Sequence, residues 1–331
     1  LCGSFSYASS MRLTTADGRT LWLAYGMNVH SGGDRASTEA AIHDTVMPLR
    51  ERLGVTGPFG LAVRWNAAGV AVMQRQPQAV QHLAAVLAAH DLHVFSGNAF
   101  VHGDFHGRPL KDEVYRPGWT EIPRAAYTQG FAQILAQLPS AAERLSLSTV
   151  PLGWKGWALG EEAQAACARS LVSVAKGLHH TARETGRHIT LALEPEPGCT
   201  LELTEELRAF VRGPLAEALA DRSELATHLG VCYDVCHQAV EWEDVEANLM
   251  TLAADGVPLA KLQASCALEI QQPCHPEARA ALAAFDEETY LHQVGARDVE
   301  GALRQAADLP EVLAEGSTWH EAAPWRVHFH V

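Results

Sequence analysis

Short apolar runs alternate with longer runs rich in Ala, Leu and Glu along the 331-residue chain. The apolar runs have the length of buried strands, and the longer runs have the pattern of helices. Helices between strands force parallel pairing, because a parallel crossover needs a dozen or more residues. The predicted strands are Leu21–His30, Phe59–Asn66, Leu92–Phe100, Leu145–Val150, His188–Glu196, His228–His237, Pro258–Ala264 and Trp325–Val331.

Eight strands, each but the last followed by a helical pattern, predict a (β/α)8 TIM barrel. An open doubly wound sheet is the alternative, but no glycine-rich dinucleotide fingerprint follows the first strand. We expect an N-terminal extension over 1–20, as a hairpin or partly disordered, and one barrel domain over 21–331 with a long insertion around 265–324. The predicted helices are Thr38–Leu53, Pro77–His90, Arg124–Leu138, Glu161–Thr185, Thr204–Asp221, Asp244–Asp255, Pro276–Ala284 and Val299–Ala314.

The composition of the chain indicates which kinds of partner and which cellular compartment to expect. The net charge of −14 disfavours binding to a nucleic-acid backbone, which needs a basic surface. Seven cysteines, an odd number in a long chain, favour a reducing, cytoplasmic compartment over a disulfide framework, and no apolar run is long enough to predict a membrane span. The chain begins at Leu1 and stops at Val331 within an alternating apolar run, so we expect a barrel that lacks its C-terminal strand and helix.

Two carboxylates follow an apolar strand in the segment Leu193–Gly198, which reads Leu-Glu-Pro-Glu-Pro-Gly. Glu194 and Glu196 come where the strand ends, and this end of a barrel carries the active site. The prolines stop the strand, and strand alternation would direct both carboxylates to one side. The alternative is a solvated strand exit with no chemical role.

Another apolar strand delivers Asp234 and, three residues later, His237. A carboxylate and an imidazole together suit Mn, Zn, Co or Fe, and they suit Mg less well because of the histidine. Gln263, at the end of the following strand, can offer a neutral oxygen to the same ion, and Lys261 faces the same side. The alternative is that Asp234 caps the next helix beside a hydrogen-bonded histidine.

Further polar residues near strand ends are candidates for contact with a small-molecule substrate. His328 and His330 alternate with apolar neighbours, so they share one face of the last predicted run. The expected substrate contacts are His30, Asn98, His102, His106, Lys261, His292, His328 and His330.

The Leu193-Glu194 strand end and the string Cys-Tyr-Asp-Val-Cys-His at 232–237 resemble the xylose isomerase-like barrel superfamily of sugar-phosphate isomerases, epimerases and endonuclease IV-type enzymes. Within it, the chain is most similar to EboE-type metabolite traffic proteins. The resemblance implies a divalent metal held by Glu, Asp, His and Glu from strands five to eight. Glu194 and Asp234 match this set, and His237 matches a histidine that binds a second metal or the substrate. Gln263 replaces the strand-seven histidine, and the last Glu has no counterpart.

These observations together predict a divalent-metal-dependent isomerase or epimerase that acts on a small polar metabolite, or hands it over, in an Ebo-type trafficking pathway. Glu194 or Glu196 would move the proton next to a carbonyl, and His237 would bind the substrate oxygen. One alternative is a non-catalytic binding or transport-accessory barrel that works with other proteins of the pathway. An endonuclease IV-like phosphodiesterase is disfavoured by the acidic charge.

Overall fold

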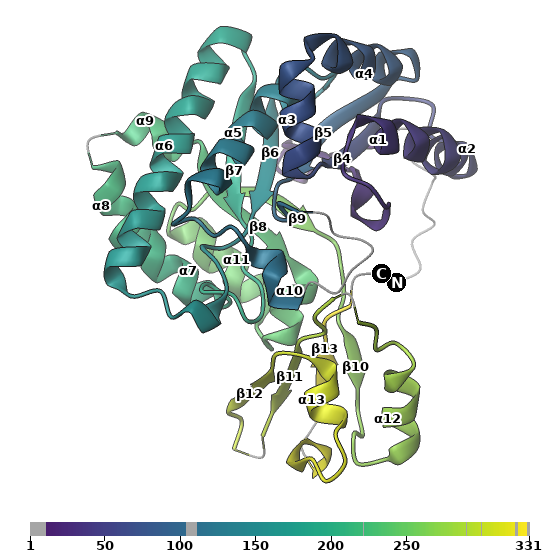
Figure 1. Cartoon of the computed structure of the whole chain (residues 1–331), viewed down its shortest axis with the longest axis vertical. Coiled ribbons are helices and arrows are strands. Elements are labelled where there is room, and N and C mark those ends of the chain that lie inside the picture. Colours follow the sequence, from purple (N-terminus) through teal and green to yellow (C-terminus); the bar gives the residue numbers. More distant parts are fainter. Residues whose placement is uncertain are drawn as a thin grey trace.

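The computed structural model describes residues 11–103, 111–220, 222–288, 290–298, 300–321 and 324–329. Over these residues, seven parallel strands form one sheet, and each pairs with the next strand of the sheet along the chain (Figure 1). The strands are β3 (Tyr25–Gly26), β4 (Phe59–Arg64), β5 (Leu92–Asn98), β6 (Arg144–Thr149), β7 (His188–Leu193), β8 (Leu229–Asp234) and β9 (Leu259–Gln263).

The strand order shows a barrel-type sheet. A doubly wound sheet reverses its order at a switch point, whereas this order is sequential throughout. The sheet is also strongly curved, because Lys261 Nζ on β9 donates to Ser148 Oγ on β6 at 3.2 Å, although β7 and β8 lie between them. The expected α/β fold, a (β/α) barrel that no eighth strand closes within the described residues, is confirmed.

Helices connect the strands and cover the outside of the sheet (Figure 1). The longest of the described helices, α6, begins with Glu161 and Glu162 in its first turn, where the helix dipole favours carboxylates. It ends at Thr185 and is capped by Gly186, which has a φ of 73°. Among the described helices, none is both long and apolar enough to cross a membrane. The helices around the sheet are α1 (Arg35–Ala41), α2 (Met47–Leu53), α3 (Ala67–Arg75), α4 (Pro77–Ala89), α5 (Ile122–Leu135), α6 (Glu161–Thr185), α7 (Thr204–Phe210), α8 (Ala216–Leu219), α9 (Ser223–Ala226), α10 (Val235–Val240) and α11 (Val245–Ala254).

A second, smaller sheet lies below the barrel in Figure 1 and is antiparallel, with the order β10-β13-β11-β12 among the described residues. The small sheet and its two helices take up most of 265–324, the range in which we expected an insertion. They have their own apolar cluster around Val294, Val312 and Trp325. Its elements are β10 (Leu268–Ile270), α12 (Pro276–Ala283), β11 (Val294–Arg297), β12 (Leu303–Ala306), α13 (Leu309–Leu313) and β13 (Trp325–Val327). Before the barrel, β1 (Arg12–Thr14) and β2 (Thr20–Trp22) pair as a hairpin.

Several predicted elements need correction. Trp325–Val327 is not the last barrel strand, because it pairs antiparallel with β10 and β11 in the small sheet. The helix predicted at Val299–Ala314 is instead β12 followed by the short α13. The first predicted strand, Leu21–His30, contains only two residues of the barrel sheet, in β3.

The strand predicted at His228–His237 also ends early, at Asp234. The Asp234 carboxylate accepts hydrogen bonds from the backbone N–H groups of Cys236 and His237, and this N-cap begins helix α10 directly. His237 therefore lies on a helix rather than on a strand.

The small sheet packs against α10 through a close backbone approach at Gly295. A Cβ atom on Gly295 would lie 1.9 Å from the carbonyl oxygen of Val240. Trp242 Nε1 donates to Gly295 O at 3.1 Å, and the Arg326 guanidinium lies 3.8 Å from the centre of the Trp242 ring. This contact positions the small sheet beside the end of the barrel where β8 ends.

Gly295→Ala is therefore expected to destabilise the protein by about 1–3 kcal/mol, because the added methyl group must push two backbones apart. Urea unfolding measures this change. The control is Gly213→Ala, since no atom lies within 4 Å of a Cβ at that position. Equal stability of the two variants would show that the small sheet does not pack closely on α10.

The carboxyl group of Glu241, the residue that follows α10, is buried and contacts the small sheet. Gln305 Nε2 on β12 donates to both oxygens of Glu241, at 2.9 and 2.7 Å. Burial, with the nearby negative charge of Glu202, raises the pKa of Glu241 to about 8, and the Gln305 hydrogen bond opposes this shift. An exposed glutamate has a pKa of about 4.3. The neutral Glu241 carboxyl therefore stabilises the fold fully below a pH of about 4. This stabilisation is lost as the pH rises from about 4 through 8.

Glu241→Gln removes this titration. As the pH rises from 5 to 8, the unfolding free energy of the variant is expected to increase by about 2–4 kcal/mol relative to that of the unchanged protein. Urea unfolding at the two pH values measures the gain, and the comparison cancels any constant effect of the amide. Glu143→Gln, at an exposed position, is the control and should show no gain. A pH-independent difference for Glu241→Gln would contradict the raised pKa.

Candidate metal centre

A cavity of about 760 Å³ opens at the end of the barrel where the parallel strands finish. Its lining includes the predicted residues Glu194, Glu196, Asp234, His237 and Gln263. Residues just before β11 and just after β13, two strands of the small sheet, also line the cavity. Since parallel strands end at the same edge, residues far apart in the sequence meet here.

The two strand-end carboxylates approach each other across the amide of Gln263. Gln263 Nε2 donates to Glu194 Oε1 at 2.6 Å and to Asp234 Oδ2 at 2.5 Å. Ser265 Oγ donates to Asp234 Oδ1 at 2.6 Å. The other oxygen of Glu194, Oε2, is buried and has no hydrogen-bond partner in the part of the chain that the structure describes.

His237 lies next to this pair. Its Nδ1 is 2.9 Å from Pro195 O, and because a carbonyl only accepts, Nδ1 carries the proton. Its Nε2 lies 3.9 Å from Asp234 Oδ2. One ligand atom from each of Glu194, Asp234 and His237 lies within 4.8 Å of the others. Asp234 therefore caps a helix through Oδ1 and faces the cluster through Oδ2, so the two interpretations of the sequence are compatible.

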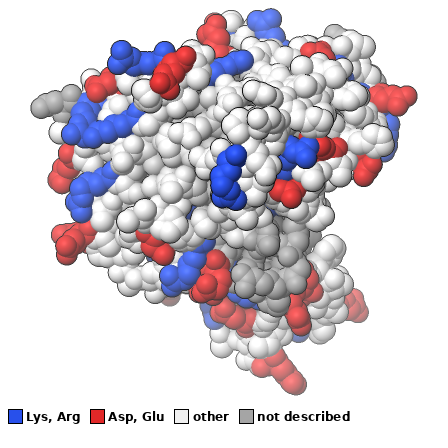
Figure 2. Space-filling model, turned by 45° about the horizontal axis from the view of Figure 1, so that its top comes forward, with Lys and Arg blue, Asp and Glu red and all other residues white. Residues whose placement is uncertain are grey.

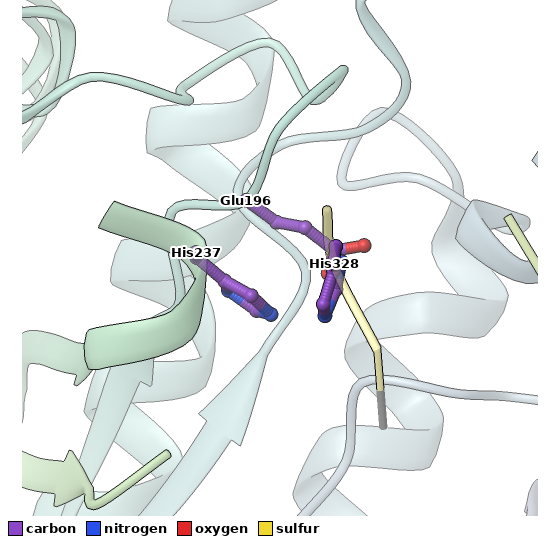
Figure 3. Close-up of side chains that lie close together, drawn as sticks. All are labelled: Glu196, His237 and His328. Atoms are coloured by element: carbon purple, nitrogen blue, oxygen red, sulfur yellow. The ribbon is translucent and has the colours of Figure 1, made fainter. Parts of the chain in front are cut away.

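A second cluster shares His237 and adds Glu196 and His328, again with one ligand atom from each within 4.8 Å of the others. Figure 3 shows the three side chains converging from separate segments. Glu196 Oε1 accepts from Tyr115 OH at 2.7 Å and from Gln293 Nε2 at 3.2 Å. The rings of His237 and His328 are 4.6 Å apart between centres, at 74° to each other.

The buried acids alter the protonation of the centre. Burial alone would lower the pKa of His237, but the negative charges of Asp234, Glu196 and Glu194 outweigh it and raise this pKa to about 9. Burial also raises the pKa of Glu196. The centre therefore has an excess of buried negative charge that a proton or another cation offsets, and its oxygen and nitrogen donors fit a divalent ion.

The other predicted substrate contacts divide into two groups. Asn98 and His328 line the cavity. His30, His102, Lys261 and His292 do not, and His106 and His330 lie outside the described residues.

Each of the residues away from the cavity has another contact. His30 Nε2 is 3.1 Å from Tyr25 OH, and the His102 ring packs edge-on against Tyr127. Lys261 contacts Ser148 inside the barrel. His292 Nδ1 lies 3.7 Å from an oxygen of Asp308 and its Nε2 lies 3.9 Å from an oxygen of Glu287.

Arg64, Tyr115 and Gln293 are polar cavity residues that were not predicted from the sequence. Arg64, at the end of β4, donates to His30 O at 3.2 Å, and its position at a strand end was a usable signal. Tyr115 and Gln293 hydrogen-bond to Glu196 from far away in the sequence, Tyr115 from the short 3-10 helix Lys111–Tyr115 and Gln293 from the segment before β11. Gln293 directly follows His292, and the structure directs the glutamine rather than the histidine into the cavity.

Two solved structures are distantly similar to this chain. No family model and no curated protein matches the chain. A 1.8 Å crystal structure of the IolI protein with a bound zinc atom aligns with 71% of this chain and 69% of its own, at 15% identity and a TM-score of 0.41. A D-tagatose 3-epimerase-like protein aligns with 64% of this chain and 67% of its own, at 11% identity and a TM-score of 0.36.

Proposed function

We propose that this chain is a divalent-metal-dependent isomerase or epimerase for a small polyhydroxylated carbonyl compound. The observation that carries the proposal is the convergence of three buried carboxylates and two buried imidazoles on one cavity. The cavity volume of about 760 Å³ lies within the usual range for small-molecule sites, about 300–1,000 Å³. The mixed donors favour Mn, Zn, Co or Fe over Mg.

A bound ion supplies Lewis-acid polarisation of substrate oxygens. The chain itself supplies the proton transfer. Glu194 Oε2 accepts the proton from the carbon next to the carbonyl and returns it to the neighbouring carbon on the same face, which isomerises the compound. Gln263 holds the other carboxylate oxygen in place at 2.6 Å, which directs Oε2. Asn98 and Arg64 line the cavity as contacts for substrate hydroxyl groups.

A non-catalytic binding or handover protein is the second candidate. The specific observation in its favour is Gln263, whose neutral amide bridges Glu194 and Asp234. An EboE-type role in a cytoplasmic metabolite-trafficking pathway, with other proteins as partners, belongs to the same proposal and rests on the sequence strings at 193–198 and 232–240.

Phosphodiester cleavage is disfavoured. The net charge is −14, and on the face shown in Figure 2 basic and acidic side chains are interspersed without a continuous basic stripe. A backbone-binding surface for nucleic acid needs clustered Lys and Arg side chains.

Solvent deuterium exchange separates an enzyme from a binding protein without knowledge of the product. The protein is incubated in D2O with a panel of ketoses and ketose phosphates, and NMR follows loss of the proton next to each carbonyl. We expect loss of that proton from at least one compound, abolished by a chelator and restored by Mn²⁺, Zn²⁺ or Co²⁺. Binding of a compound without exchange would overturn the catalytic proposal in favour of the handover protein.

A further inference from the structure

The described residues offer two places for one ion, and these places share His237. Both clusters use one nitrogen of this imidazole, because Nδ1 is committed to Pro195 O at 2.9 Å. A lone pair on Nε2 binds a single ion. The ion therefore lies either with Glu194 and Asp234 or with Glu196 and His328.

The space between Glu194 and Asp234 already has an occupant. The Gln263 amide nitrogen donates to both carboxylates, at 2.6 and 2.5 Å, so its two hydrogens satisfy one oxygen of each acid. Ser265 Oγ satisfies the remaining oxygen of Asp234. An ion at this place must first displace or turn the amide.

At the second place, surrounding groups hold the ligands in position. Gln293 Nε2 donates to Pro197 O at 3.1 Å, and because a carbonyl only accepts, this end of the amide is the nitrogen. Gln293 Oε1 is then the acceptor for His328 Nδ1, at 2.7 Å. His328 therefore carries its proton on Nδ1 and presents Nε2 to the cluster, as His237 does.

This arrangement is typical of metal-binding histidines, which donate their second ring N–H to a carbonyl or carboxylate. From its nitrogen end, the same Gln293 amide also donates to Glu196 Oε1, so one side chain orients two of the three ligands. One ligand atom from each of Glu196, His237 and His328 lies within 4.8 Å of the other two, so the three can converge on one ion.

We infer that Glu196, His237 and His328 form a two-histidine, one-carboxylate centre that holds the divalent ion, and that Glu194, Asp234 and Gln263 form a hydrogen-bonded group beside it. The inference rests on the proposed function only in that the chain binds a divalent ion. Two-histidine, one-carboxylate sites suit Fe²⁺, Mn²⁺, Co²⁺ and Zn²⁺ and leave coordination positions open, here toward the cavity.

The small sheet thereby contributes a ligand to the barrel's site. His328 follows β13 directly, and its backbone N–H donates to Gln293 O, just before β11, at 2.9 Å. Ion binding therefore joins the small sheet to Glu196 and α10 of the barrel.

Cobalt titration of the metal-free chain tests the assignment. Calorimetry gives the affinity for Co²⁺, and visible absorption reports its coordination. Glu196→Gln and Asp234→Asn form a matched pair, since each removes one buried negative charge beside His237. We expect Glu196→Gln and His328→Gln to bind Co²⁺ at least about 100-fold more weakly, and Asp234→Asn to keep the wild-type spectrum and bind within about threefold.

Gln293→Leu tests the orienting role, with an expected 10–100-fold loss of affinity. Loss of binding in Asp234→Asn with binding kept in His328→Gln would place the ion at the other cluster and overturn the inference, while the proposed function would stand. Absence of Co²⁺ binding by the wild-type chain would overturn both.

A measurement on the unmodified protein guards against variants that fail to fold. In NMR spectra of the Co²⁺-bound chain, each ligating histidine with a protonated Nδ1 gives one exchangeable, strongly shifted N–H resonance. We expect two such resonances, from His237 and His328. A single resonance would contradict the centre.

Discussion

His237→Ala is expected to weaken binding of the divalent ion by at least about 100-fold. This imidazole belongs to both clusters of possible ligands, so its loss removes a donor wherever the ion lies. Calorimetric titration of the metal-free variant with Zn²⁺ or Co²⁺ measures the effect.

His292→Ala is the matched control. His292 is also a buried histidine near two acids, with nitrogens 3.7 Å from Asp308 and 3.9 Å from Glu287, but it does not line the cavity. Its replacement should leave ion affinity unchanged. If His237→Ala binds the ion as tightly as the unchanged protein, the metal centre does not lie at this end of the barrel.

Glu194→Gln is expected to slow deuterium exchange by about 10²–10⁴-fold, the contribution usual for a general base, while the ion stays bound. The buried Oε2 is the proton acceptor in the proposed reaction, and an amide at this position accepts no proton. NMR exchange rates and metal content of the same sample give the two readouts together.

Glu243→Gln provides the comparison, because Glu243 lies outside the cavity and accepts hydrogen bonds from Thr204. It should retain the exchange rate of the unchanged protein. Unchanged exchange in Glu194→Gln would move the base to another residue, and loss of the ion from this variant would place Glu194 among the ligands.

The barrel was predictable from the sequence because its strands are buried, apolar and separated by helices. Glu194 and Asp234 were predictable for the same reason, since the first polar residues after such strands meet at one edge of the sheet. Glu194, Asp234 and His237 each have one ligand atom within 4.8 Å of the others.

The small sheet and the position of His328, which it contributes to the site, were not predictable from strand patterns. Its strands have three or four residues each, too few to show an alternating pattern, and Val299–Ala314 therefore resembled a helix. His328 was predicted as a substrate contact, but its approach to Glu196 depends on antiparallel pairing between β11 and β13. Long-range pairing of short strands leaves little trace in a single sequence.

Anomalous X-ray diffraction from a crystal of the Zn²⁺-loaded protein, recorded at the zinc absorption edge, tests the central claim most directly. We expect one strong peak in the cavity, about 2.0–2.2 Å from a Glu196 oxygen and from the Nε2 atoms of His237 and His328. A peak between Glu194 and Asp234, with the Gln263 amide displaced, would contradict the assigned ligands. Absence of any peak in the cavity would contradict the metal centre itself.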